Sequence, residues 1–148
     1  MITLDTNVLV YLMDDSEPTK QDIAAEVIGA VAARGGPIAL QVVGEMQNAA
    51  IRKLKMPPFI VAQAARNVLS TFPTIGSTAA DAEIALGQMA SGRLSYWDAL
   101  LLSSIRRAGC STLLTEDMQD GSTQLGVRII NPFTGEGLSQ AARDALNA

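Results

Sequence analysis

Hydrophobic residues along the chain fall into short unbroken runs that alternate with longer stretches of helical spacing. The short runs predict strands at residues 2–4, 37–40, 111–115 and 127–130, and a strand or turn at 74–77. In the longer stretches apolar positions recur on one helical face, as Ile23, Val27 and Val31 do. These stretches predict helices over residues 7–13, 19–34, 42–54, 58–71, 78–90, 95–108 and 138–148.

Strands that alternate with helices usually lie parallel, because each helix carries the chain back across the sheet in a right-handed crossover. We therefore expect an α/β protein with three layers, α/β/α, in which helices cover a central, mostly parallel sheet. The sequence contains no internal repeat, low-complexity tract or linker. Its 148 residues are enough for one domain with a sizeable core.

The composition indicates the class of protein and its cellular location. Hydrophobic residues make up 48% of the chain and charged residues 18%, which is typical of a compact globule. No apolar run reaches the ~18 residues that a membrane span needs, so we expect no membrane contact. Met1 leads directly into a strand pattern without a secretory leader, and the single cysteine, Cys110, has no partner for an internal disulfide. Both observations favour the cytoplasm.

The absence of histidine limits the chemistry. It excludes Ser-His-Asp and Cys-His catalysis, and with one cysteine it leaves no normal zinc site. A metal ion would have to be held by oxygen ligands, which favours Mg²⁺ or Mn²⁺. The net charge of −4 argues against a non-specific nucleic-acid binder. It is compatible with an enzyme whose acids surround cations.

Two acids directly follow predicted strands. Asp5 comes after the strand at 2–4, and Asp117 comes after the strand at 111–115. The carboxyl ends of parallel strands meet at one edge of the sheet, where ligands bind in such folds. Each acid also has a structural interpretation: Asp5 as a helix cap, and Asp117 as part of the polar turn "EDMQDG".

Two further acids lie on predicted helices. Asp98 shares a helical face with Leu101, Leu102 and Ile105, and an ionised acid on an apolar face needs a partner. The alternative is a capping box, since Ser95 precedes Asp98 by the required spacing. Glu45 follows the strand at 37–40 on a mixed helical face, which favours a solvated side chain.

The four acids taken together are stronger evidence for a ligand site than any one of them alone. Carboxylates gathered at one sheet edge raise one another's pKa and destabilise the fold unless a cation is present. The pattern therefore predicts a site for a divalent cation.

The blocks "LDTNVLVYL", "GEM", "SYWDALLLSSIRRAGCSTLLTEDMQDG" and "VRIINPF" resemble the PIN-domain ribonucleases, and within them the VapC-type toxins of bacterial toxin–antitoxin pairs. The resemblance covers residues 1–133, which would form the PIN-like nuclease domain. Residues 134–148 would then be a C-terminal helical tail.

This resemblance implies an Mg²⁺- or Mn²⁺-dependent endoribonuclease. Its acidic site would consist of Asp5, Glu45, Asp98 and Asp117, of which Asp5, Asp98 and Asp117 would ligate metal. Glu45 would bind metal or orient the attacking water. The supporting polar positions would be Asn7, Thr115 and Asp120. It also implies a homodimer and an antitoxin partner whose tail enters the active groove.

Several basic residues are candidates for contacts with RNA phosphates, and each is also an ordinary surface charge: Arg52, Lys53, Lys55 and Arg93. Arg106 and Arg107 end their helix, where they complement its dipole. Tyr96 and Trp97 begin that helix and are expected to be core or dimer contacts.

Two other functions stay open. One is a catalytically silent PIN-fold module that binds a protein. The other is an aspartyl-phosphate phosphohydrolase with Asp5 as nucleophile. The second is disfavoured because Asn7 replaces the usual partner acid, and none of Lys20, Lys53 and Lys55 follows a late strand.

Overall fold

The computed structural model describes all residues from 1 to 148. It contains seven helices: α1 (Thr6–Leu12), α2 (Pro18–Ala33), α3 (Leu40–Arg52), α4 (Pro58–Thr71), α5 (Ala79–Ala90), α6 (Tyr96–Arg107) and α7 (Gln140–Asn147). The strands are β1 (Ile2–Leu4), β2 (Ile38–Ala39), β3 (Thr74–Ile75), β4 (Thr112–Leu114), β5 (Thr123–Gln124), β6 (Val127–Ile130), β7 (Phe133–Thr134) and β8 (Gly137–Leu138).

The main sheet has the strand order β1-β4-β6-β5. β1, β4 and β6 are parallel, and β5 is an antiparallel edge strand. The register pairs Leu4 with Leu114 and Leu114 with Ile130, so the three parallel strands end level with one another. β2 and β3 form a separate parallel pair, and β7 and β8 form a short hairpin. The predicted mostly parallel sheet is confirmed.

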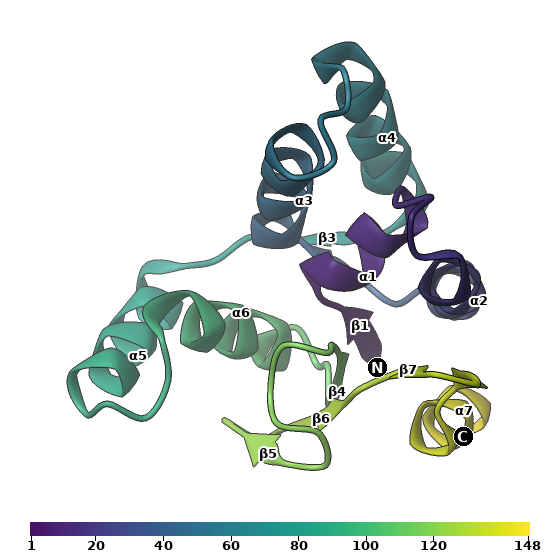
Figure 1. Cartoon of the computed structure of the whole chain (residues 1–148). Helices are drawn as coiled ribbons and strands as arrows, with labels where there is room; N and C mark the ends of the chain where they lie inside the picture. Colours follow the sequence, from purple (N-terminus) through teal and green to yellow (C-terminus); the bar gives the residue numbers. More distant parts are fainter.

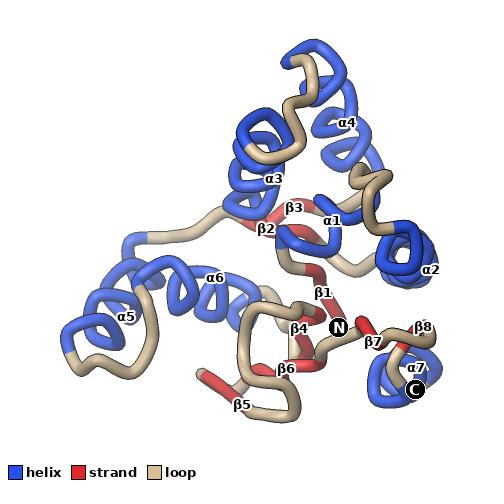
Figure 2. Tube along the Cα trace, viewed as in Figure 1, coloured by secondary structure: helices blue, strands red, loops and turns tan.

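Helices lie on both sides of this sheet, which confirms the three-layer arrangement. In Figure 1, α5 and α6 lie on one side of β1, β4 and β6, and α2 and α7 lie on the other. Figure 2 shows the strands at the centre and α3 and α4 rising from β2 and β3. Leu4, Leu113, Leu114, Ile129 and Ile130 are all buried in the core. Each such side chain contributes roughly 1.5–3 kcal/mol through burial.

The last helix is packed more firmly than a loose tail. Ala142 and Leu146 on α7 are buried in the main hydrophobic cluster. The predicted helix at 138–148 begins later because Leu138 pairs with Phe133 in the β7–β8 hairpin. The division of the chain at residue 133 stays a prediction.

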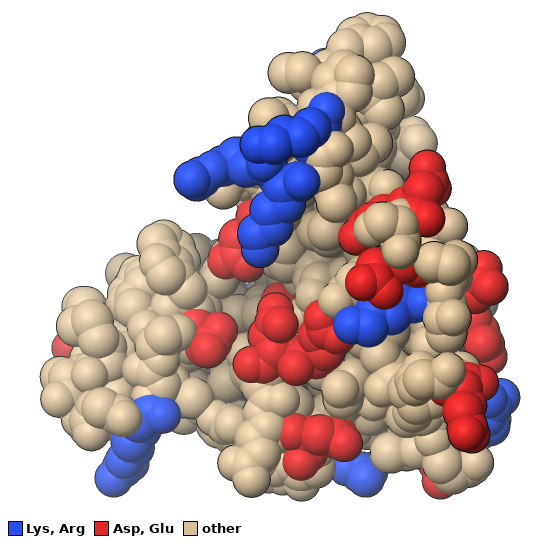
Figure 3. Space-filling model, in the orientation of Figure 1, with Lys and Arg blue, Asp and Glu red and all other residues tan.

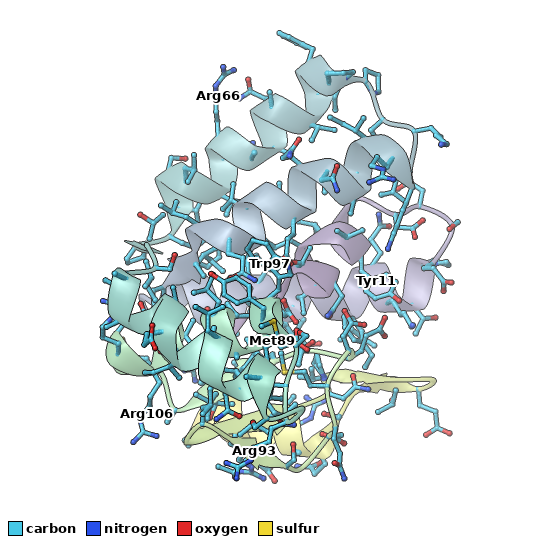
Figure 4. The ribbon with its side chains drawn as sticks, turned by 90° about the vertical axis from the view of Figure 1, so that its left-hand side faces the viewer. Tyr11, Arg66, Met89, Arg93, Trp97 and Arg106 are labelled. Carbon is cyan, nitrogen blue, oxygen red and sulfur yellow. The ribbon has the colours of Figure 1, made fainter.

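Trp97 is not a core residue. It is 61% exposed at the start of α6, so the core interpretation of this side chain is wrong. Figure 4 looks onto the face of the molecule where Trp97 and Met89 are found. Separately, no helix is both long and apolar enough to cross a bilayer.

Asp81 joins α5 to α6. It forms a capping box with Thr78 at the start of α5, and its side chain is 2% exposed. Arg107 Nη2 lies 2.9 Å from Asp81 Oδ2, and the Ser103 hydroxyl donates to Oδ1 over 2.8 Å. Burial raises the pKa of Asp81, but the hydrogen bonds from Arg107, Thr78 and Ser103 outweigh it and hold the pKa well below its usual range. Arg107 therefore has a specific partner beyond the helix dipole.

We expect Asp81→Asn to lower the free energy of unfolding by roughly 2–3 kcal/mol, because it removes the charge that Arg107 and Ser103 stabilise. Urea denaturation at neutral pH measures the loss. Glu83→Gln, an exposed change on the same helix, serves as the control. Equal effects of the two substitutions would contradict the role assigned to Asp81.

Candidate active site

Asp5 lies at the carboxyl end of β1 and begins α1. Its Oδ1 accepts a hydrogen bond from the Thr6 backbone N–H over 2.7 Å, so it is the N-cap residue of that helix. Its Oδ2 accepts from the Thr115 hydroxyl over 2.8 Å. The residue is only 7% exposed. The capping role and a role in a site are therefore compatible, because one oxygen serves the helix and the other faces the end of β4.

Thr115 connects Asp5 to Asp117. Besides donating to Asp5, its Oγ1 accepts from Asn7 Nδ2 over 2.9 Å and from the Asp117 backbone N–H over 3.1 Å. Asn7 Nδ2 also donates to Asp117 Oδ2 over 3.1 Å. The two acids that follow β1 and β4 thus belong to one hydrogen-bond network, as their positions after parallel strands predict.

Glu45 reaches this network from α3. Its Oε2 accepts from the Thr6 hydroxyl over 2.8 Å, and its Oε1 accepts from Gln41 Nε2 over 3.0 Å. The residue is exposed, but its carboxylate has fixed partners. Glu45 is therefore a solvent-exposed side chain, as its mixed helical face predicts, and hydrogen bonds also hold its carboxylate at the site.

Asp98 comes from the first turn of α6. Its backbone N–H donates to the Ser95 hydroxyl over 3.1 Å, which is one half of the predicted capping box. The other half is missing, since the Asp98 carboxylate makes no hydrogen bond. That carboxylate is half-buried and lines the same pocket as Asp5. It is free to bind a ligand there.

The four acids line one cavity of about 780 Å³. Figure 3 shows acidic side chains gathered in a hollow of the surface, with basic side chains above it. Two cationic residues from the end of α3 and the turn after it, Arg52 and Lys53, also line this cavity. Its acidic residues are Asp5, Asp14, Glu45, Asp98, Glu116 and Asp117.

Burial and nearby negative charge raise the pKa of Asp5 to about 6. Burial is the main cause, and the negative charges of Asp117 and Glu45 add to it. The hydrogen bonds from Thr6 and Thr115 oppose the shift but do not cancel it. Ionising Asp5 therefore costs more free energy than ionising an exposed aspartate, and positive charge in the pocket would offset that cost.

The oxygen-rich lining fits a hard divalent cation in its chemistry. The side chains are not gathered around one point, since no three acidic groups lie close enough together to hold an ion. Glu45 and Asp117 are exposed and are held by hydrogen bonds rather than by packing, and the half-buried Asp98 carboxylate has no hydrogen-bond partner.

Some predicted residues lie outside the cavity lining. Thr115 is fully buried behind it, where it orients Asp5 and Asn7. Asp120 accepts from the Asn131 backbone N–H over 2.8 Å, which ties its turn to the end of β6. Lys55 and Arg93 are exposed and do not line the cavity. Figure 4 shows Arg93 on the side of the molecule formed by α5 and α6.

Sequence reasoning missed six polar residues that line the cavity: Thr6, Tyr11, Asp14, Gln41, Asn48 and Glu116. Thr6 and Gln41 orient Glu45, and Tyr11 lines the cavity. Gln41 precedes Glu45 by one helical turn, a spacing that places both on one face and could have revealed it. Tyr11 gave no such signal, because its role depends on residues far along the chain.

Comparisons with known proteins agree with this architecture. The family model of the PIN domain matches residues 2–119. Among solved structures, the chain is similar to VapC20 of Mycobacterium tuberculosis, described as a Sarcin-Ricin loop cleaving toxin, with 19% sequence identity and a TM-score of 0.58. The similarity covers 79% of this chain and 90% of VapC20, and at this identity it shows a shared fold. No curated protein matches the sequence.

The raised pKa of Asp5 predicts how metal-free stability depends on pH. The cost of ionising Asp5 in the folded state is absent well below its unfolded pKa of 3.8 and complete above the folded value of about 6. Asn at this position keeps an acceptor for Thr6 and loses the charge. In EDTA, we expect Asp5→Asn to gain about 2 kcal/mol of unfolding free energy over the wild type between about pH 4.5 and pH 7.5.

Urea denaturation at the two pH values measures this gain. Asp22→Asn, an exposed change on α2, is the control and should track the wild type. The expectation would be contradicted by a difference in unfolding free energy between Asp5→Asn and the wild type that stays constant or shrinks with rising pH. Such a result would show that the charge of Asp5 does not destabilise the fold.

Proposed function

The chain belongs to the PIN-domain family, and we propose that it is a metal-dependent endoribonuclease that hydrolyses phosphodiester bonds in RNA. The observation that carries this proposal is the meeting of Asp5, Glu45, Asp98 and Asp117 in one cavity. They come from four separate parts of the chain. The pKa of Asp5 is raised mainly by burial and further by the charges of Asp117 and Glu45. Such a pocket is suited to bind a cation.

Asp5, Asp98 and Asp117 are the proposed ligands for Mg²⁺ or Mn²⁺. When bound, such an ion activates a water molecule and stabilises the charge that develops on the scissile phosphate. Thr115 and Asn7 hold Asp5 and Asp117 in place through the hydrogen bonds described above. Glu45, held by Thr6 and Gln41, would orient the attacking water or bind the ion.

Arg52 and Lys53 are the proposed contacts for RNA. Both line the cavity that contains the acids, at the end of α3 and just after it. A phosphate backbone that enters the acidic pocket needs positive charge nearby, and these residues supply it despite the net charge of −4. Lys55 and Arg93 are proposed as more distant contacts.

We also propose that the protein is the toxin of a type II toxin–antitoxin pair, acting in the cytoplasm as a homodimer. Support comes from the shared fold with VapC20, which is described as a toxin. Large apolar side chains on α5 and at the start of α6 are exposed, which suits a subunit contact: Ile84, Leu86, Met89 and Trp97. A small open reading frame directly upstream would support an antitoxin partner.

The purified protein is expected to cleave RNA with Mg²⁺ or Mn²⁺ and to lose this activity in EDTA. Asp98→Asn should lower the rate by roughly 100-fold or more, because it removes a carboxylate from the ion. Asp144→Asn on α7 is the control, because it removes the same charge outside the cavity. This variant should cleave RNA at the wild-type rate. Cleavage that survives EDTA, or an active Asp98→Asn, would contradict the assignment; no cleavage at all would favour a silent binding module.

Exchanging Arg52 and Lys53 together for Ala should raise the KM for RNA and leave kcat nearly unchanged, since these residues bind phosphates rather than reacting groups. The dependence of binding on salt should weaken by roughly one unit of slope for each residue. Arg66→Ala on α4 removes an exposed arginine outside the cavity and is the control (Figure 4). A matching KM increase in the control would show a general charge effect.

A further inference from the structure

Two acids follow β4 in direct succession, and they have different partners. Asp117 accepts from Asn7 over 3.1 Å and belongs to the network around Asp5. Glu116 also lines the cavity, but its carboxylate is bound by Tyr11 and Lys20. The two adjacent carboxylates at the edge of the proposed metal site therefore have different hydrogen-bond partners.

The residues that bind the Glu116 carboxylate come from distant parts of the chain. Lys20 Nζ, on α2, lies 3.0 Å from Glu116 Oε2 and 2.9 Å from the hydroxyl of Tyr11. The Tyr11 hydroxyl, on α1, donates to Glu116 Oε1. Lys20 also lies 4.6 Å from the centre of the Tyr11 ring, within the range of a cation–π contact. These three residues form what we call the Glu116 clamp.

A further aromatic residue supports the clamp. The ring of Phe133 on β7 packs edge-on against Tyr11, with ring centres 5.0 Å apart and an interplanar angle of 66°. Phe133 lies beyond residues 2–119, the part of the chain that the family model matches. The position of Tyr11 at the cavity wall therefore depends on the C-terminal segment as well as on α1.

Both oxygens of Glu116 are occupied in the clamp, and Lys20 balances its charge. The Glu116 side chain is 22% exposed and that of Lys20 33% exposed, so the pair is partly sheltered from water. Charge-assisted hydrogen bonds of this kind are stronger than neutral ones. Of the six carboxylates that line the cavity, Glu116 is the one with a cationic partner.

We propose that Lys20 and Tyr11 are positioning residues that withhold Glu116 from the metal ion, so that Asp117 serves the site in its place. This inference rests on the proposed function. Without the clamp, Glu116 is a free carboxylate beside Asp117 and competes for the ion. An added anionic ligand tightens the binding of a hard cation but changes the arrangement needed for hydrolysis.

Lys20→Met tests the inference, because Met keeps much of the aliphatic stem and removes the cation. Binding of Mn²⁺ without RNA is followed by the electron paramagnetic resonance signal of free Mn²⁺, and RNA cleavage gives kcat and KM. We expect Mn²⁺ to bind several-fold more tightly and kcat to fall about tenfold. The KM for RNA should stay within about twofold of wild type. Adding Glu116→Gln to Lys20→Met should return the Mn²⁺ affinity to the wild-type value.

The matched control is Arg143→Met. Arg143 Nη1 lies 3.9 Å from Glu26 Oε1, so this change also removes an ion pair anchored on α2, but away from the cavity. It should leave Mn²⁺ affinity, kcat and KM unchanged. If Lys20→Met lowers only the melting temperature, the clamp merely stabilises the fold and the inference is overturned.

Glu116→Gln alone keeps the inference testable if Lys20→Met does not fold. We expect wild-type Mn²⁺ affinity, because Glu116 is not a ligand while it is clamped. Weaker Mn²⁺ binding in this variant would overturn the inference and make Glu116 a ligand. A wild-type protein that neither binds Mn²⁺ nor cleaves RNA would overturn the proposed function too, whereas normal wild-type behaviour with an unchanged Lys20→Met would overturn the clamp alone.

Discussion

Asp5 is a nearly buried carboxylate that the fold places among other acids, and the rest of the site depends on how its charge is stabilised. Burial raises the pKa of Asp5 to about 6, and hydrogen bonds from Thr6 and Thr115 offset only part of this shift. The negative charges of Asp117 and Glu45 add a smaller upward contribution. A protein that needed only a helix cap at this position could use Ser or Asn. A buried, crowded aspartate makes physical sense when a cation is part of the working state.

The parallel sheet brings Asp5 close to the residues that follow β4. β1 and β4 are paired in register, so the residues that follow them, Asp5 and Thr115, emerge side by side at the same edge. The Thr115 hydroxyl then links Asp5, Asn7 and Asp117. Glu45 and Asp98 are added from α3 and α6, which border the same cavity. The topology of the sheet and its neighbouring helices thus places the acidic residues around one cavity. Hydrogen bonds then orient Asp5, Asn7 and Asp117.

The sequence predicted the elements that have strong local signals. α4 begins at Pro58 and ends at Thr71 as expected, and the acids after β1 and β4 were found from the strand pattern. The short strands β5, β7 and β8 are not predicted from the sequence, because they lie in polar or glycine-rich turn segments without an apolar run. The spacing of Ser95 and Asp98 indicates a capping box as one alternative, and only half of it forms, whereas Thr78 and Asp81 form a complete one. The clamp around Glu116 joins residues about a hundred positions apart, and one sequence holds no record of such contacts.

Carboxylates from separate parts of the chain are proposed to share one ion. Anomalous scattering from crystals grown with Mn²⁺ would locate that ion. We expect a manganese peak in the cavity, within ligand distance of Asp5 and of Asp98 or Asp117, and no comparable peak in crystals of Asp5→Asn. A cavity without a peak at saturating Mn²⁺, with the acidic side chains turned toward separate regions of solvent, would show that these carboxylates do not share an ion.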